Sequence, residues 1–163
     1  MKTILLLAVL ALAGVYVFGA VRFSELGVLE YLGDLETLAM NGKTREYCDR
    51  LHEDMEVSIR DTSGESTVAL DGGKEELCDH ITEAYKGMGL LGVSMETRVD
   101  DIEVTRSWLH PWTADISYSE KRTMRIRAAK LMIKSESDDE WTLVQTFSGM
   151  KVMRLVSEAR LAE

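Results

Sequence analysis

The segment best suited to ligand binding is Trp108-Leu109-His110-Pro111-Trp112. Histidine has an unperturbed pKa near neutrality, which suits it to proton transfer, and tryptophan offers a large contact area with one hydrogen-bond donor. If the segment is extended, both tryptophans and the histidine share one side of it. Asp115 and Tyr118 follow and could face the same space. We take as pocket or binding candidates Trp108, His110, Trp112, Asp115 and Tyr118; the alternative is a packed corner that closes the core at Pro111.

The other ionisable side chains fit surface positions. His52 lies in an acidic step before a predicted strand, where a capping or surface role is expected. His80 lies beside Asp79 on the polar side of a predicted helix. Three arginines near and within one predicted strand alternate with apolar residues, which is typical of the solvated face of a sheet, although they could bind an acidic partner. They are Arg122, Arg125 and Arg127.

Motifs with a specific chemistry are missing from the sequence. It has no nucleophile elbow, no phosphate-cradling glycine loop and no paired catalytic carboxylates, and its two cysteines lack metal-ligand spacing. We therefore assign no catalytic residue and expect neither a cofactor nor a metal ion.

Residues 28–60 predict the elements around which the chain is organised. Apolar residues recur at helical spacing over 28–40, and Asn41-Gly42 tolerates the left-handed conformation that ends a helix. Thr44 can cap a short second helix. From Met55 to Arg60 the period changes to two, which indicates a strand.

The rest of the chain predicts one more helix and several strands. Residues 66–70 form a short strand, and residues 74–88 form the third helix. Later strands are expected over 93–99, 102–104, 113–120, 123–135 and 140–156. Ser137-Asp138-Asp139 predicts a hairpin turn between the last two.

The order of these elements resembles the nuclear transport factor 2-like superfamily, which includes the SnoaL-like cyclases and the ketosteroid isomerases. The resemblance covers roughly residues 28–157 and rests on the helix that ends near Asn41-Gly42, the short second helix and the acidic step His52-Glu53-Asp54. It implies an α+β fold: a cone with three N-terminal helices packed on a curved antiparallel sheet. We expect a domain over 23–157 and a frayed tail over 158–163.

The resemblance also bears on chemistry and on the cysteines. The position of the isomerase tyrosine corresponds to Glu36, and that of the general-base aspartate to Ser58 or Ile59, so isomerase activity does not carry over. In the cone the second and third helices are neighbours, so Cys48 and Cys78 are expected to form a disulfide in an oxidising compartment. Two buried thiols are the alternative.

The N-terminus predicts a membrane segment. Residues 4–21 are almost uninterruptedly apolar, and eighteen helical residues span about 27 Å, close to the roughly 30 Å of a bilayer core. We expect residues 1–22 to form one transmembrane anchor, in effect an uncleaved signal; secretion after signal cleavage is the alternative. Positive-inside logic places the domain outside the cytoplasm, on the periplasmic side of an inner membrane.

The charge of the domain excludes one class of partner. The 19 Lys and Arg residues less Lys2 and Arg22 leave 17, against 28 acidic residues that all follow Arg22, a balance of −11. Such a surface repels phosphate backbones, so nucleic-acid binding is not expected.

Two functional hypotheses remain. The first is a membrane-tethered binding or assembly module that forms a homodimer or binds a protein partner through its sheet face. The second is an isomerase- or cyclase-type enzyme with an apolar small molecule in the cone. The anchor, the acidic surface and the unmatched isomerase positions favour the first. A buried ionisable group in an open pocket would favour the second.

Overall fold

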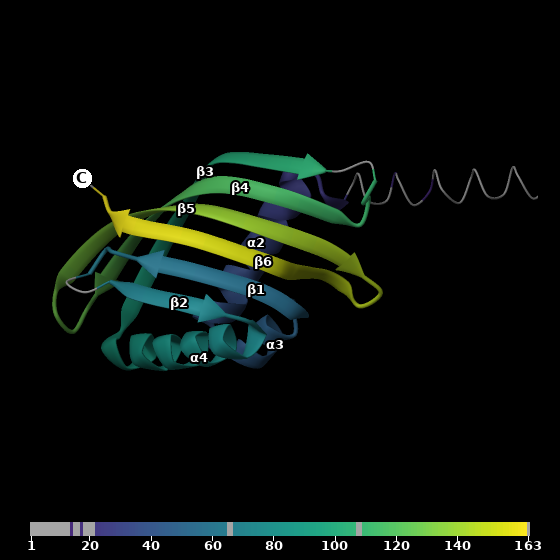
Figure 1. The fold of residues 1–163 in the computed structure, drawn as a ribbon. Coiled ribbons are helices and arrows are strands. Elements are labelled where there is room, and N and C mark those ends of the chain that lie inside the picture. The colour runs from purple at the N-terminus through teal and green to yellow at the C-terminus, as the bar shows by residue number, and fades with distance from the viewer. Residues whose placement is uncertain (1–13, 15–16, 18–21, 65–66, 107–108, 163) are drawn as a thin grey trace, which may run out of the picture.

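The structure is a computed structural model that describes residues 14, 17, 22–64, 67–106 and 109–162. Its elements lie in the order helix, helix, two strands, helix, four strands (Figure 1). They are α2 (Glu25–Met40), α3 (Thr44–Cys48), β1 (Leu51–Asp61), β2 (Val68–Gly72), α4 (Lys74–Leu91), β3 (Val93–Arg106), β4 (Thr113–Ile126), β5 (Leu131–Thr146) and β6 (Gly149–Leu161).

The six strands form one open, curved sheet in the order β2-β1-β6-β5-β4-β3. The helices cover one of its faces, which we call the inner face. Neighbouring strands are antiparallel except for β1 and β6, which run parallel. The prediction of an α+β fold with a curved sheet is confirmed, and the parallel pair is the exception to the antiparallel sheet that was expected.

Helix α2 follows its predicted pattern. The Ser24 hydroxyl accepts a hydrogen bond from the Gly27 amide at 3.2 Å and caps its start. Its apolar stripe is buried, and the helix ends at Asn41-Gly42, where Gly42 has a φ of 68° that glycine adopts without strain. The stripe comprises Val28, Tyr31, Leu32, Leu35 and Ala39.

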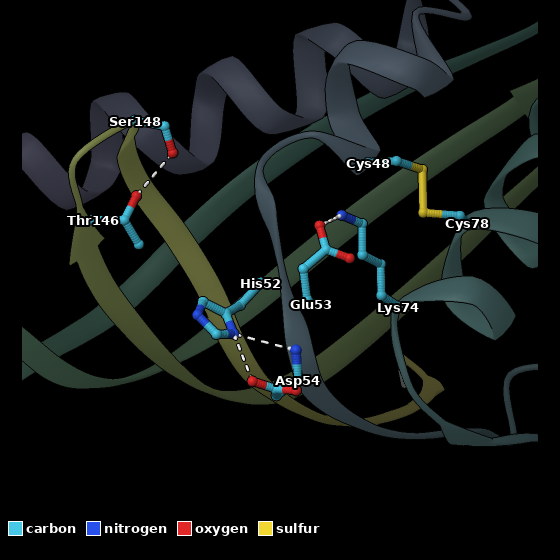
Figure 2. Close-up of polar contacts among 8 residues, drawn as sticks. All are labelled: Cys48, His52, Glu53, Asp54, Lys74, Cys78, Thr146 and Ser148. Atoms are coloured by element: carbon cyan, nitrogen blue, oxygen red, sulfur yellow. Dashed lines mark hydrogen bonds and ion pairs between the residues drawn. A yellow bond between two sulfur atoms is a disulfide. The ribbon is translucent and has the colours of Figure 1, made fainter.

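A disulfide joins α3 to α4. Cys48 at the end of α3 is bonded to Cys78 in α4, with 5.9 Å between their Cα atoms (Figure 2). Closing a loop with a sequence separation of 30 residues contributes about 3–4 kcal/mol of stability in the chain-entropy account. The start of α4 is also fixed to β1, because the Lys74 ammonium lies 2.7 Å from a Glu53 carboxylate oxygen.

The predicted hairpin at Ser137-Asp138-Asp139 is wrong, because β5 runs through it without a break. Ser137 and Asp139 are both buried on the inner face, and the Ser137 hydroxyl donates to the Asp139 carboxylate at 2.9 Å. Asp138 points outward and accepts from Ser119 at 3.0 Å. The side chains that are typical of a turn are therefore satisfied within strands, and the actual turn follows Thr146.

The expected frayed tail is also wrong for most of its length. Strand β6 continues to Leu161, whose backbone position pairs with Ser135 of β5, and Glu158 pairs with Arg60 of β1. Because β6 lies between two strands, its last residues find backbone partners on both sides.

The predicted membrane anchor, residues 4–21, lies outside the described residues except for Gly14 and Val17. In the part of the chain that is described, no helix combines the length and the apolar character needed to cross a bilayer.

Candidate functional site

A cavity of about 230 Å³ lies between the helices and the inner face of the sheet. Its walls come from α2, α3, α4, β3, β4 and β5. Seven of the side chains in the wall are apolar: Leu29, Leu32, Leu35, Ala39, Ile81, Met95 and Val99. Polar or amphipathic side chains complete it: Glu36, Tyr47, Tyr85, Thr97, Tyr118, Glu120, Arg122 and Trp141.

Strand β4 supplies three of the polar residues. Tyr118, Glu120 and Arg122 alternate along it, and a period of two puts all three on the inner face. The same face of β4 begins with Ala114 and Ile116, which are buried in the apolar core. One strand therefore carries side chains from the packed core into the cavity.

Glu120 is a carboxyl group inside an otherwise largely apolar wall. It is 7% exposed, and it accepts a hydrogen bond from the Arg122 guanidinium. Burial raises the pKa of Glu120, Asp139 adds repulsion, and the attraction of Arg122 offsets only part of the rise. A carboxyl group with a raised pKa can release and take up a proton closer to neutrality than an exposed one.

A second buried carboxyl group stands beside this pair. Asp139 of β5 lies opposite Tyr118 in the sheet. Burial raises the pKa of Asp139, and the hydrogen bonds from Ser157 and Ser137 offset only part of that rise. Burial alone would lower the pKa of Arg122, but Glu120 and Asp139 raise it, so the guanidinium stays charged. Two carboxyl groups thus share one cation.

Helix α2 contributes Glu36 from the opposite wall. The Thr97 hydroxyl of β3 donates a hydrogen bond to the Glu36 carboxylate, and Thr97 lies beside Arg122 in the sheet. This contact ties the helix to the strands across the cavity.

Two buried N–H groups in the cavity wall have no partner among the described residues. They are Nε of Arg122 and Nε1 of Trp141. A buried donor without a partner costs about 1–3 kcal/mol, and both atoms expose essentially no surface, so they reduce the stability of the folded chain and are not contact points for a bound molecule.

Tyrosine hydroxyls add further donors. Burial raises the pKa of Tyr47, Tyr85 and Tyr118, so all three keep their protons at neutral pH. Protonated phenols can donate hydrogen bonds to a carbonyl or enolate oxygen.

Known structures match the chain along most of its length. A putative scytalone dehydratase from Novosphingobium aromaticivorans aligns at 14% identity with a TM-score of 0.63, covering 83% of this chain and 82% of that one. An NTF2-like protein with a cystatin-like fold from the same organism aligns at 16% identity with a TM-score of 0.54, covering 83% and 89%. The β subunit of benzoate 1,2-dioxygenase from Burkholderia mallei aligns at 8% identity with a TM-score of 0.65, covering 84% and 91%.

The chain has the nuclear transport factor 2-like fold. The resemblance predicted from the sequence is thereby confirmed. No family model matches the sequence, and no curated protein matches it. At these identities the structural likeness establishes the fold, and the chemistry must be argued from this chain's own residues.

Of the two positions that correspond to catalytic residues of the isomerases, one lies in the cavity wall and the other does not. Glu36 lines the cavity where the resemblance located a catalytic tyrosine. Ser58 donates to Asp71 at 2.7 Å at an exposed position, and Ile59 packs against the core. The departure from the isomerase pattern is therefore real, and the ionisable groups of this cavity are Glu36, Glu120 and Arg122 with three tyrosines.

Of the predicted pocket residues that are described, only Tyr118 lines the cavity. Trp108 lies outside the described residues. His110 and Trp112 are exposed in the connection between β3 and β4. Asp115 is exposed and accepts a hydrogen bond from Thr142 at 2.7 Å. The two other histidines are not in the cavity wall either: His80 is exposed, and His52 Nδ1 accepts from the Asp54 amide at 3.2 Å (Figure 2).

Sequence reasoning missed Glu120 and misassigned Arg122, which was predicted on a solvated face with Arg125 and Arg127. Arg125 is indeed exposed. The signal was available in the period of β4, because continuing the alternation from Ile116 through Tyr118 places Glu120 and Arg122 inside. The prediction ended one strand at residue 120 and began another at 123, which interrupted that count.

Proposed function

We propose that the cavity binds a small, largely apolar molecule with an oxygen acceptor and that Glu120 exchanges a proton with it, as in an isomerase- or cyclase-type enzyme. The observation that carries the proposal is a buried carboxyl group with a raised pKa in the wall of a mostly apolar cavity. Such an arrangement costs stability and is typical of functional sites.

Each polar residue has a role in this proposal. The Glu120 carboxylate removes a proton from a carbon next to a carbonyl group and returns it at another position. The carbonyl oxygen, which becomes negative, accepts a hydrogen bond from a tyrosine hydroxyl in the wall. Asp139 and Arg122 set the pKa of Glu120 without touching the substrate.

The cavity limits the size of the substrate. Its volume of about 230 Å³ lies below the roughly 300–1,000 Å³ that is usual for ligand pockets. A single substituted ring fits this volume better than a fused polycyclic molecule. One structural neighbour is described as a putative scytalone dehydratase, which supports proposing an enzyme with a small organic substrate.

Hydrogen–deuterium exchange of cyclohexanone tests the proposal. Proton NMR in heavy water would follow loss of the signal from the carbons beside the carbonyl. We expect the wild type to accelerate exchange over buffer and Glu120→Gln to reduce the acceleration by about 10²–10⁴-fold, the usual contribution of a general base.

Glu96→Gln is the matched control, because Glu96 is an exposed glutamate on the neighbouring strand β3. It should exchange cyclohexanone at the wild-type rate. Equal rates for the wild type and Glu120→Gln would contradict the assignment of Glu120.

The second candidate function is a membrane-tethered binding or assembly module on the outer side of the membrane. The apolar run at residues 4–21 and the small cavity volume support it. A neighbour named as a dioxygenase β subunit indicates that the fold also serves in assemblies. Self-association of the chain together with no exchange above buffer would favour this candidate.

A further inference from the structure

Exposed apolar side chains lie at both ends of the domain, and four of them lie at the end where α2 begins. Phe147 is fully exposed, and Leu26, Leu109 and Trp112 are 76%, 63% and 44% exposed. We call these four residues the apolar rim. They come from the first turn of α2, the connection between β3 and β4, and the turn between β5 and β6.

Backbone contacts bring the two connections of the apolar rim together. The Gln145 amide donates to the Trp112 carbonyl at 2.7 Å, and Thr113 pairs with Val144. Phe147 follows Gln145 by two residues. The β3–β4 connection and the β5–β6 turn therefore lie side by side at the same end of the sheet (Figure 1).

Helix α2 begins at this end. The Tyr31 hydroxyl donates to the Met150 carbonyl at 3.1 Å, and Met150 follows the β5–β6 turn. Arg22, Leu26 and Met150 line one surface depression. The chain thus enters the domain next to the β5–β6 turn.

The turn that carries Phe147 is held by its neighbours. The Thr146 and Ser148 hydroxyls lie 2.9 Å apart (Figure 2), and the Thr146 hydroxyl also donates to the Gly149 carbonyl at 2.8 Å. Gly149 has a φ of 120°. Since these contacts define the turn, a fully exposed phenylalanine between them adds no internal packing, and it indicates an external partner.

The sequence indicates what that partner is. The apolar run of residues 4–21 ends directly before Arg22, three residues before α2 begins. A bilayer-spanning run would hold this end of the domain at the membrane surface. Tryptophan and phenylalanine favour the membrane interface, and Arg22 and Arg106 place cations at the same end for lipid phosphates.

We propose that the apolar rim rests on the lipid bilayer, with Trp112 and Phe147 inserted into the interface beside the predicted anchor. The partner is the bilayer itself and not a protein. This surface is independent of the cavity and of the proton exchange assigned to it.

The opposite end of the sheet offers a matched reference. Leu131 and Met132 are exposed apolar residues at the start of β5, and Phe147 follows its end. Fifteen residues of extended strand separate Met132 from Phe147, or about 50 Å. A domain that rests on its apolar rim holds Met132 far from the lipid.

The test uses the full chain in phosphatidylcholine vesicles whose acyl chains carry bromine, which quenches tryptophan fluorescence on contact. Phe147→Trp and Met132→Trp each add one indole to the native three. We expect the emission of the indole added at 147 to fall about twofold or more relative to unbrominated vesicles, because an interfacial apolar face is buried about 5–10 Å. The indole added at 132 should keep its emission.

A second variant covers a failure of the first to fold, which circular dichroism would reveal. Trp112→Phe removes a native indole that the proposal places in the interface, so the bromine-dependent loss of emission should shrink. Equal quenching at 132 and 147, or no quenching at either, overturns the proposal. The proposal is also overturned if the chain is recovered free of vesicles. It is overturned as well if the emission at 147 changes only with protein concentration, and that outcome would assign the apolar rim to contact with a second copy of the chain.

Discussion

The inner face of the sheet has two halves that differ in what fills them. The half next to the start of α2 is filled by apolar side chains, and its one buried side-chain hydroxyl among the core residues, that of Tyr31, is hydrogen-bonded to backbone carbonyls. The essentially inaccessible side chains there are Val28, Ile116, Leu51, Leu143 and Val152. In the other half the same strands present Tyr118, Glu120, Ser137 and Asp139, which are buried but polar. The change happens within two residues of β4, between Ile116 and Tyr118.

The difference separates stability from chemistry. Close-packed apolar side chains supply most of the folding free energy, whereas desolvated carboxyl groups reduce it. The helices over the polar half are held by other means: the Cys48–Cys78 disulfide and the hydrogen bond from Thr97 to Glu36. A domain that gives up packing in one half and replaces it with cross-links keeps that half open for a ligand.

The largest effect should come from the packed half. Leu143→Ala removes a fully buried side chain and should lower the free energy of unfolding by about 2–5 kcal/mol, because a cavity remains where close packing was. Urea unfolding followed by circular dichroism measures this. Leu161→Ala, at an exposed position near the end of β6, should cost less than about 0.5 kcal/mol. Similar losses for both variants would show that this half is not the stabilising one.

The fold could be predicted where local residues decide it. Gly42 ends α2 because few other residue types adopt a positive φ without strain, and the helical stripe of α2 could be recognised from the sequence. The turn at Ser137–Asp139 was mispredicted because a buried strand that faces a polar cavity has the composition of a turn. The real turn contains Phe147, whose exposure only the tertiary structure reveals.

The site was less predictable than the fold. Charged residues that alternate along a strand usually face water, so the residue types of Glu120 and Arg122 gave no sign of burial, and only the unbroken alternation of β4 could have shown it. The burial of Glu120 and the partial burial of Arg122, whose side chain is 39% exposed, depend on α2 and α4 covering this part of β4, which is a long-range property. His110 and Asp115 attracted attention by residue type, but both are exposed.

Removing side chains from the polar half should not lower the free energy of unfolding, unlike Leu143→Ala in the packed half. The triple variant Glu120→Met, Arg122→Met and Asp139→Asn replaces both carboxyl groups and their shared cation by uncharged side chains, which is often neutral or stabilising by about 1–4 kcal/mol. It should also abolish exchange of cyclohexanone. The matched control is Glu96→Met with Arg125→Met, an exposed pair 3.9 Å apart, whose removal should change stability by about 1 kcal/mol or less. Urea unfolding measures both, and a clear loss of stability in the first would assign the charge pair a structural role.

The smallest expected effect is a dependence of the free energy of unfolding on pH, which should come from the polar half of the inner face and not from the packed half. Because burial raises the pKa of Glu120 above its unfolded value, the folded chain keeps that proton over a pH range in which the unfolded chain has lost it. The free energy of unfolding should therefore fall as pH rises from about the ordinary value of 4.5 through the folded pKa. Asp139 acts in the same direction, so Glu120→Gln should flatten this fall without removing it.

Urea unfolding at several pH values between about 5 and 8 measures the slope, which reports protons bound by the folded chain. The exposed carboxylates Glu53, Glu76 and Asp138 have lowered pKa values and act at lower pH, where they make stability fall with acidification. Leu143→Ala provides the comparison between the halves, since it should lower stability equally at every pH and leave the slope unchanged. If the free energy of unfolding of Glu120→Gln instead falls with pH as steeply as that of the wild type, the pKa of Glu120 is not raised in the folded state. The proposed general-base role then loses its electrostatic support.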